Sequence, residues 1–140
     1  MGIDAGFDMV PRLTKCAVDV HYWEQFIKSV QSHYKDDLRV EEKQNYILFK
    51  AGEHPSLPFE GHKLLRFSSK VSGSIAANRG VEAYIDTVTR IARVHFGPRV
   101  HYWHEGFDGY GHYDWDEVNE SIRSYEQVCH GPIGLIRNTN

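Results

Sequence analysis

Histidines and aromatic residues are concentrated in one stretch of this 140-residue chain, between His95 and Tyr125. The chain as a whole contains 9 histidines, 8 tyrosines, 7 phenylalanines and 3 tryptophans. Histidine exchanges protons near neutral pH, and aromatic rings line the apolar pockets that bind small molecules. The stretch therefore predicts a site where a small apolar molecule binds and a proton is transferred.

The segment 99–105 has the composition of a strand, so its side chains alternate between two faces. One face carries Arg99, His101, Trp103 and Glu105, and the other carries Val100, Tyr102 and His104. If the second face completes the core, His101 and Glu105 lie beside the indole of Trp103, in a cleft or facing solvent. A histidine held by a carboxylate is a general base or acid. The opposite orientation places His104 in the core beside Tyr102, and the sequence leaves both orientations open.

Candidate site residues follow from this pattern. The candidate catalytic residues are His101 with Glu105, followed by His104 and His112. The candidate substrate-binding residues are Trp103 and Tyr102, with Asp8 and Arg66 as charge partners. Asp4 and Asp8 are about 13 Å apart along a strand, too far to form a carboxylate dyad by themselves. Either carboxylate can instead pair with Arg66 or Lys70 from a neighbouring strand.

The same stretch also offers nitrogen and oxygen ligands for Zn²⁺ or Mn²⁺. These are His101, His104, Glu105, Asp108, His112, Asp114 and Asp116. Their spacing argues against a metal, because residues three apart on a strand face opposite ways and the helical pattern of metalloproteases is missing. We expect no metal ligands and no cofactor. A metal-dependent enzyme using His101 to Asp116 ranks third among the possible functions.

The long loop predicted over 51–61 holds a further group that can do chemistry. Glu53, His54 and Pro55 lie in it, and His62 follows closely. Such a loop can close over a site as a lid, although an ordinary surface loop is the preferred interpretation.

Composition excludes several classes of protein. The chain has 16 Lys and Arg against 19 Asp and Glu, a net charge of −3, which disfavours nucleic acid as the main partner. No run reaches the ~18 apolar residues that a membrane span needs, and the N-terminus lacks a secretory signal. The two cysteines fit a reducing compartment as free residues. We expect a soluble, cytoplasmic protein without a membrane partner.

Hydrophobic periodicity predicts the elements that must position these residues. A period of two predicts strands over 3–9, 63–71 and 99–105, and a hairpin formed by 38–43 and 46–50. A helical period predicts a helix that begins at an Asp19 N-cap and carries the apolar stripe Trp23, Phe26, Ile27, Val30 and Tyr34. A second helix over 81–92 ends before Gly97 and Pro98, and a third begins at Asp114. Residues 72–80 are expected to be a connector.

This order of elements indicates an α+β fold. We expect a single domain over 1–126, with a mainly antiparallel sheet and two or three helices packed on one face. The order also matches the split βαβ arrangement of ferredoxin-like folds, if 63–71 is an added strand. Residues 127–140 are expected to form a tail that is mobile or docks as an edge strand.

The leading functional hypothesis is a cofactor-free acid–base enzyme acting on a small apolar molecule, of the isomerase, cyclase, dehydratase or decarboxylase type. The alternative is a non-catalytic protein-interaction module, or a homodimer, in which the aromatic residues are contact anchors.

Overall fold

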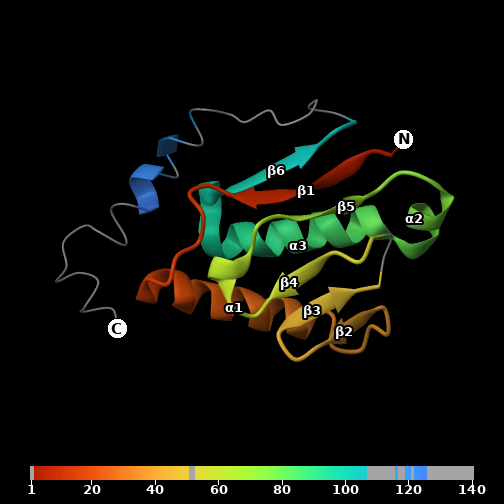
Figure 1. Cartoon of the computed structure of the whole chain (residues 1–140), viewed down its shortest axis with the longest axis horizontal. Coiled ribbons are helices and arrows are strands. Elements are labelled where there is room, and N and C mark those ends of the chain that lie inside the picture. Colours follow the sequence, from red (N-terminus) through yellow and green to blue (C-terminus); the bar gives the residue numbers. More distant parts are fainter. Residues whose placement is uncertain (1, 51–52, 107–115, 117–118, 121, 126–140) are drawn as a thin grey trace.

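The computed structural model describes residues 2–50, 53–106, 116, 119–120 and 122–125 of the chain (Figure 1). In chain order the elements are β1 (Asp4–Met9), α1 (Ala17–His33), β2 (Val40–Glu42), β3 (Tyr46–Phe49), β4 (Ser56–Pro58), the 3-10 helix η1 (Gly61–Lys63), β5 (Phe67–Lys70), α2 (Ser74–Arg79), α3 (Val81–Phe96), the 3-10 helix η2 (Gly97–Arg99) and β6 (Val100–His104).

The strands form two antiparallel sheets of three strands each. Sheet A has the order β5-β1-β6, and sheet B has the order β2-β3-β4. The α+β class is therefore confirmed, although the strands do not form the single sheet that the sequence predicted. In sheet A, β1 is the central strand and runs antiparallel to both of its neighbours.

Two long helices supply much of the core. Helix α3 packs on sheet A and α1 packs beside α3, as Figure 1 shows. The aromatic rings of Phe49 on β3 and Phe67 on β5 lie 5.6 Å apart and connect the two sheets. Tyr34 of α1 and Tyr84 of α3 both pack against Phe49, so one aromatic cluster joins helices and sheets.

The helical periodicity predicted both long helices correctly. Trp23, Phe26, Ile27 and Val30 of α1 are buried. Helix α3 buries apolar residues at helical spacing, among them Tyr84, Ile85 and Val88, and ends at Phe96 before the cap Gly97, whose φ of 56° is a backbone conformation that favours glycine. The predicted start of α1 is wrong. The helix begins at Ala17 after Cys16, and Asp19 lies in its first turn, where its carboxylate forms a buried ion pair described below.

Short elements were missed where turn residues dominate the sequence. Strand β4 and the first residue of η1 lie in the predicted loop 51–61, and α2 lies in the predicted connector 72–80. Leu65 lies within the strand predicted over 63–71, yet it is 77% exposed, since β5 begins only at Phe67. A three-residue strand forms because neighbouring strands pair with it, and it is too short to show a clear hydrophobic period in the sequence.

Part of the third predicted helix, including its Asp114 cap, lies outside the described residues. The described residues 116, 119–120 and 122–125 are helical. The predicted tail 127–140 also lies outside the described residues. In the described part of the chain, the helices are too short or too polar to cross a lipid bilayer.

Candidate functional site

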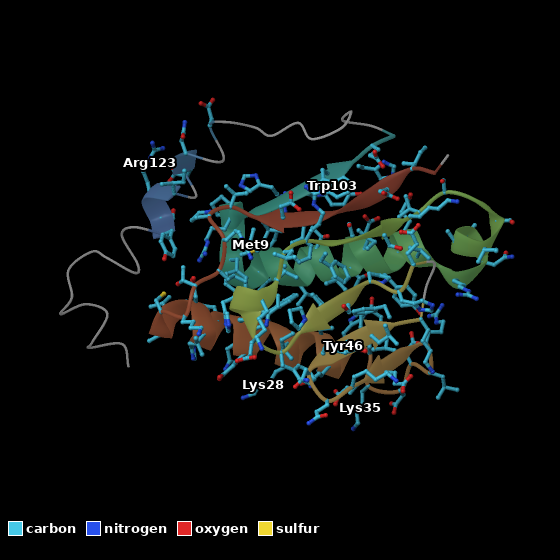
Figure 2. The ribbon with its side chains drawn as sticks, viewed as in Figure 1. Met9, Lys28, Lys35, Tyr46, Trp103 and Arg123 are labelled. Carbon is cyan, nitrogen blue, oxygen red and sulfur yellow. The ribbon has the colours of Figure 1, made fainter. Side chains whose placement is uncertain are left out.

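The face of sheet A that points away from the core carries the candidate site. On β1, Ala5, Phe7 and Met9 point into the core, so Asp4, Gly6 and Asp8 point outward. The pairing register places Trp103 of β6 opposite Gly6 and His101 opposite Asp8. Figure 2 shows Trp103 on β6 beside β1. We call Asp8, Arg66, His101 and Trp103 the outer-face cluster.

Gly6 lets the strands of this face approach one another closely. A Cβ atom at this position would collide with the backbone carbonyl of Phe67 and with Ser68 on β5. The glycine therefore admits the backbone of β5. This close approach brings the segment that carries Arg66 against β1.

Asp8 is the centre of the outer-face cluster. Arg66 donates to both carboxylate oxygens, from Nε to Oδ1 at 2.7 Å and from Nη2 to Oδ2 at 2.9 Å. The indole Nε1 of Trp103 donates to the same Oδ1 at 3.3 Å. The guanidinium carbon of Arg66 also lies 4.8 Å from the centre of a Trp103 ring. Three of the four predicted substrate-binding residues thus form one contact network.

His101 shares this face with Asp8. Directly opposed residues in an antiparallel pair have Cβ atoms about 4.5–5.5 Å apart, close enough for an imidazole and a carboxylate to interact. His101 is 3% exposed and Trp103 is 5% exposed. The cluster is therefore largely enclosed, and Arg66 is its most accessible member, with 43% of its side chain exposed.

The structure does not bring His101 and Glu105 together. The two residues are four positions apart along the chain, about 13 Å on a strand. The Oε1 atom of Glu105 instead accepts a hydrogen bond from the backbone N–H of Asp4 at 2.6 Å. Asp8 takes the position beside His101 that the sequence analysis gave to Glu105.

Negative charge accumulates at the Glu105 end of the same face. Burial raises the pKa of Asp4 above its ordinary value, and the carboxylates of Glu105 and Glu53 raise it further. Lys70 of β5, which lies opposite Asp4 in the strand pairing, lowers the pKa of Asp4 and offsets part of this effect. The two ends of the outer face therefore differ: Asp8 has an arginine partner, whereas Asp4 faces a second carboxylate.

No family model, curated protein or solved structure matches this chain. The function is therefore argued from the geometry of the described residues.

The other candidates from the strand lie on the opposite face. Tyr102 packs against the core, and the Nε2 atom of His104 lies 3.2 Å from Oε1 of Glu82 on α3. The Nδ1 atom of His104 accepts a hydrogen bond from the backbone N–H of Gly106 at 3.0 Å, so Nε2 carries the proton toward Glu82. His104 and Tyr102 therefore lie on the helix side of sheet A, away from Asp8.

The metal hypothesis receives no support within the described ranges. In these ranges no group of three His, Cys, Asp or Glu side chains is arranged to hold an ion. His112, Asp108 and Asp114 lie outside the described residues, so the predicted role of His112 stays a prediction.

A second arginine–aspartate pair was missed by sequence reasoning. Arg99 Nη1 lies 2.6 Å from Oδ1 of Asp19, and Arg99 Nη2 donates to the backbone carbonyls of Pro11 and Arg12. The backbone N–H and hydroxyl of Thr14 donate to Oδ2 of Asp19. The partners are 80 positions apart in the chain, and no local pattern in the sequence indicates this contact.

Proposed function

We propose that the outer-face cluster is the site of cofactor-free acid–base catalysis on a small apolar molecule. His101 takes and returns the proton, and Asp8 holds the imidazolium that forms. The observation that supports this proposal is the placement of Asp8 opposite His101, with both carboxylate oxygens held by Arg66.

The hydrogen bonds to Asp8 fix the orientation of its carboxylate. Charge-assisted bidentate pairs are among the stronger protein hydrogen bonds, so both oxygens are held in place. An ionised carboxylate beside an imidazole stabilises the protonated ring, as the aspartate does in a serine-protease triad. A positioned general base of this kind contributes about 10²- to 10⁴-fold to a rate.

Trp103 and Arg66 suit the binding of a substrate with one oxygen on an apolar body. The indole offers an apolar surface, and the guanidinium can donate to a carbonyl or enolate oxygen where charge develops. Because His101 is nearly enclosed, the substrate must displace a side chain to reach it. We expect Arg66 to move, since it is the most exposed member of the cluster. Proton transfer at His101 can move a proton between carbons in an isomerisation, deprotonate the attacking group in a cyclisation, assist the loss of water in a dehydration, and protonate the enolate that remains when a β-ketoacid loses CO₂.

The alternative hypothesis, a protein-interaction module, has less support in the described residues. The most exposed large apolar side chains, Leu38, Leu65, Ile75 and Val94, lie on four separate segments. Single exposed apolar residues are ordinary on protein surfaces and do not mark an interface. Homodimer formation stays a prediction.

The deciding experiment is a reactivity screen with matched variants. Small aromatic ketones, enones, β-hydroxyketones and β-ketoacids would be incubated with the protein in D₂O and followed by proton NMR for exchange or conversion. We expect His101→Gln to lower the rate about 10²- to 10⁴-fold while its circular dichroism and cooperative unfolding stay unchanged. His21→Gln is the matched control, because His21 is exposed on α1.

Two outcomes would overturn the proposal. One is a reaction whose rate is the same in the wild type and in His101→Gln. The other is a screen in which nothing reacts and no compound shifts the indole N–H resonance of Trp103.

A further inference from the structure

A cavity of about 420 Å³ lies between the chain before α1, the first turns of α1 and the segment 59–62. Its apolar lining includes Leu13, Val20, Trp23 and Phe59. Its volume is within the range of small-molecule pockets. None of the outer-face cluster residues lines it, so it is a separate site.

The indole of Trp23 forms a fixed wall of this cavity. Its Nε1 donates to the backbone carbonyl of Pro58 at 2.9 Å, and the residue is 1% exposed. The backbone of Gly61 packs against the ring so closely that a Cβ atom there would lie 2.6 Å from Cγ of Trp23. An apolar wall held in this way is already formed before a ligand arrives, which lowers the entropic cost of binding.

Two of the carboxylates that line the cavity already have cationic partners. Asp19 is held by Arg99 and by Thr14. Glu60 pairs with Lys63, and its pKa is lowered first by the hydrogen bond from Lys63 and also by the nearby charges of His62 and Lys15.

Positive charge is therefore available at the rim near Glu60. Lys15 and His62 both line the cavity, and none of the ion pairs among the described residues uses Lys15. Glu24, a further lining carboxylate, lies on the exposed side of α1. Solvent and salt there screen its interactions with other charges. An apolar interior beside an ammonium and an imidazole is complementary to a molecule with an apolar body and one anionic group.

We infer that this cavity binds a small monocarboxylic acid, with the apolar body against Trp23 and Leu13 and the carboxylate at Lys15 and His62. The inference is independent of the proposed function, because the two sites share no residue.

The test uses 4-phenylbutyrate and its uncharged analogue 4-phenyl-1-butanol as probes, with the full chain, by calorimetry and by the indole N–H resonance of Trp23. We expect the acid to bind more tightly than the alcohol. Lys15→Met should lower the affinity for the acid about fivefold, the size expected for a solvent-exposed ion pair, and leave the affinity for the alcohol unchanged. Lys28→Met, at an exposed position of α1, is the matched control and should change neither affinity.

A second variant tests the location of binding. Val20 lines the cavity and is 43% exposed, so Val20→Trp can fill the space without opening the core. It should abolish binding of both probes, whereas His101→Gln should leave both unchanged. Equal affinities for acid and alcohol, unaltered by Lys15→Met, would overturn the assigned ligand class. Failure of both probes to bind, or binding that survives Val20→Trp, would overturn the site itself.

Discussion

Two arginine–aspartate pairs connect distant parts of this protein, and they differ in their access to water. The Arg99–Asp19 pair is sealed, with side-chain exposures of 9% and 1%. The Arg66–Asp8 pair is open on the arginine side, with exposures of 43% and 10%. Both have short N···O distances, 2.6 Å and 2.7 Å, so geometry alone does not separate them.

The surroundings of the two pairs indicate different roles. Arg99 also binds the carbonyls of Pro11 and Arg12, so its hydrogen bonds tie the start of β6 to the chain between β1 and α1. A sealed pair of this kind leaves no room for a ligand and is a structural clamp. Arg66 lies over the Trp103 ring at a surface where a small molecule can approach it. The open pair therefore fits a site that binds and reacts, and the sealed pair holds the fold.

Removing the sealed arginine should have the largest effect on stability. Arg99→Met leaves the Asp19 carboxylate buried without its cation, which costs about 3–5 kcal/mol in comparable buried pairs. Urea denaturation would measure the change in the free energy of unfolding. The double variant Asp19→Leu with Arg99→Met removes both charges and should recover part of the loss. A single variant as stable as the exposed control Arg90→Met would contradict the role of this pair as a clamp.

Removing the open arginine should affect stability less and function more. Arg66→Met keeps the Trp103 hydrogen bond to Asp8 and leaves the carboxylate partly accessible, so we expect a loss of about 1–2 kcal/mol. Any turnover found in the reactivity screen should nevertheless disappear. The same urea denaturation and the screen are the measurements. A loss of stability as large as that of Arg99→Met would remove the distinction between the two pairs.

Added salt should weaken the Arg66–Asp8 pair and not the Arg99–Asp19 pair, and this effect should be smaller than those of the two substitutions. The Debye length falls to about 3 Å in 1 M salt, so an accessible charge pair is screened and an enclosed pair is not. The coupling energy between Arg66 and Asp8, measured by double-variant cycles, should fall by about 0.5 kcal/mol from 0.05 M to 1 M NaCl, on the order expected for exposed pairs. The coupling between Arg99 and Asp19 should stay the same. Equal salt sensitivity would show that both pairs have similar access to solvent.

The smallest expected effect concerns the end of the outer face that lacks an arginine. Glu105→Gln keeps an oxygen that accepts from the Asp4 N–H and removes the neighbouring charge, so the free energy of unfolding at pH 7 should rise by about 0.3–0.5 kcal/mol. The pKa of Asp4 is raised by burial and by Glu105, so the protonated form is favoured in the folded state. Its stabilising contribution is complete below the ordinary value of 3.8 and is lost as the pH rises through the raised pKa.

The pH dependence provides the check for this variant. At pH 3 the raised pKa of Asp4 leaves its carboxyl largely protonated, so it carries little charge for Glu105 to repel, and Glu105→Gln should then match the wild type in urea denaturation. A gain that persists at pH 3 would show that it does not arise from repulsion between Asp4 and Glu105.

The elements with a long hydrophobic period were predictable from the sequence. The stripe from Trp23 in α1 to Tyr34 at its C-cap is buried as expected, and the apolar face of α3 from Val81 to Ala92 is buried except for Ile91, which is partly buried. The partnership of Asp8 with Arg66 was also anticipated, because both were assigned to polar positions of neighbouring strands, and the structure confirms it.

What the sequence could not provide was contact between residues far apart in the chain. Asp19 resembles a helix cap because aspartate often caps helices, yet its partner Arg99 is fixed only when β6 meets the start of α1. The pairing of His101 with Glu105 failed for a related reason, since sharing a strand face does not bring side chains four positions apart into contact. Which carboxylate faces His101 depends on the register between β1 and β6, which the composition of neither strand determines.

The central position of β1 in sheet A has a consequence for the order of assembly during synthesis. Its partner strands lie at residues 67–70 and 100–104. Neither edge of β1 can form its hydrogen bonds until the corresponding partner has left the ribosome. At about 5–20 residues per second, the apolar side of this first strand needs shielding for about 5–20 seconds before β6 emerges. Until then, α1 and the hairpin of β2 and β3 are the elements already synthesised that can cover Phe7 and Met9.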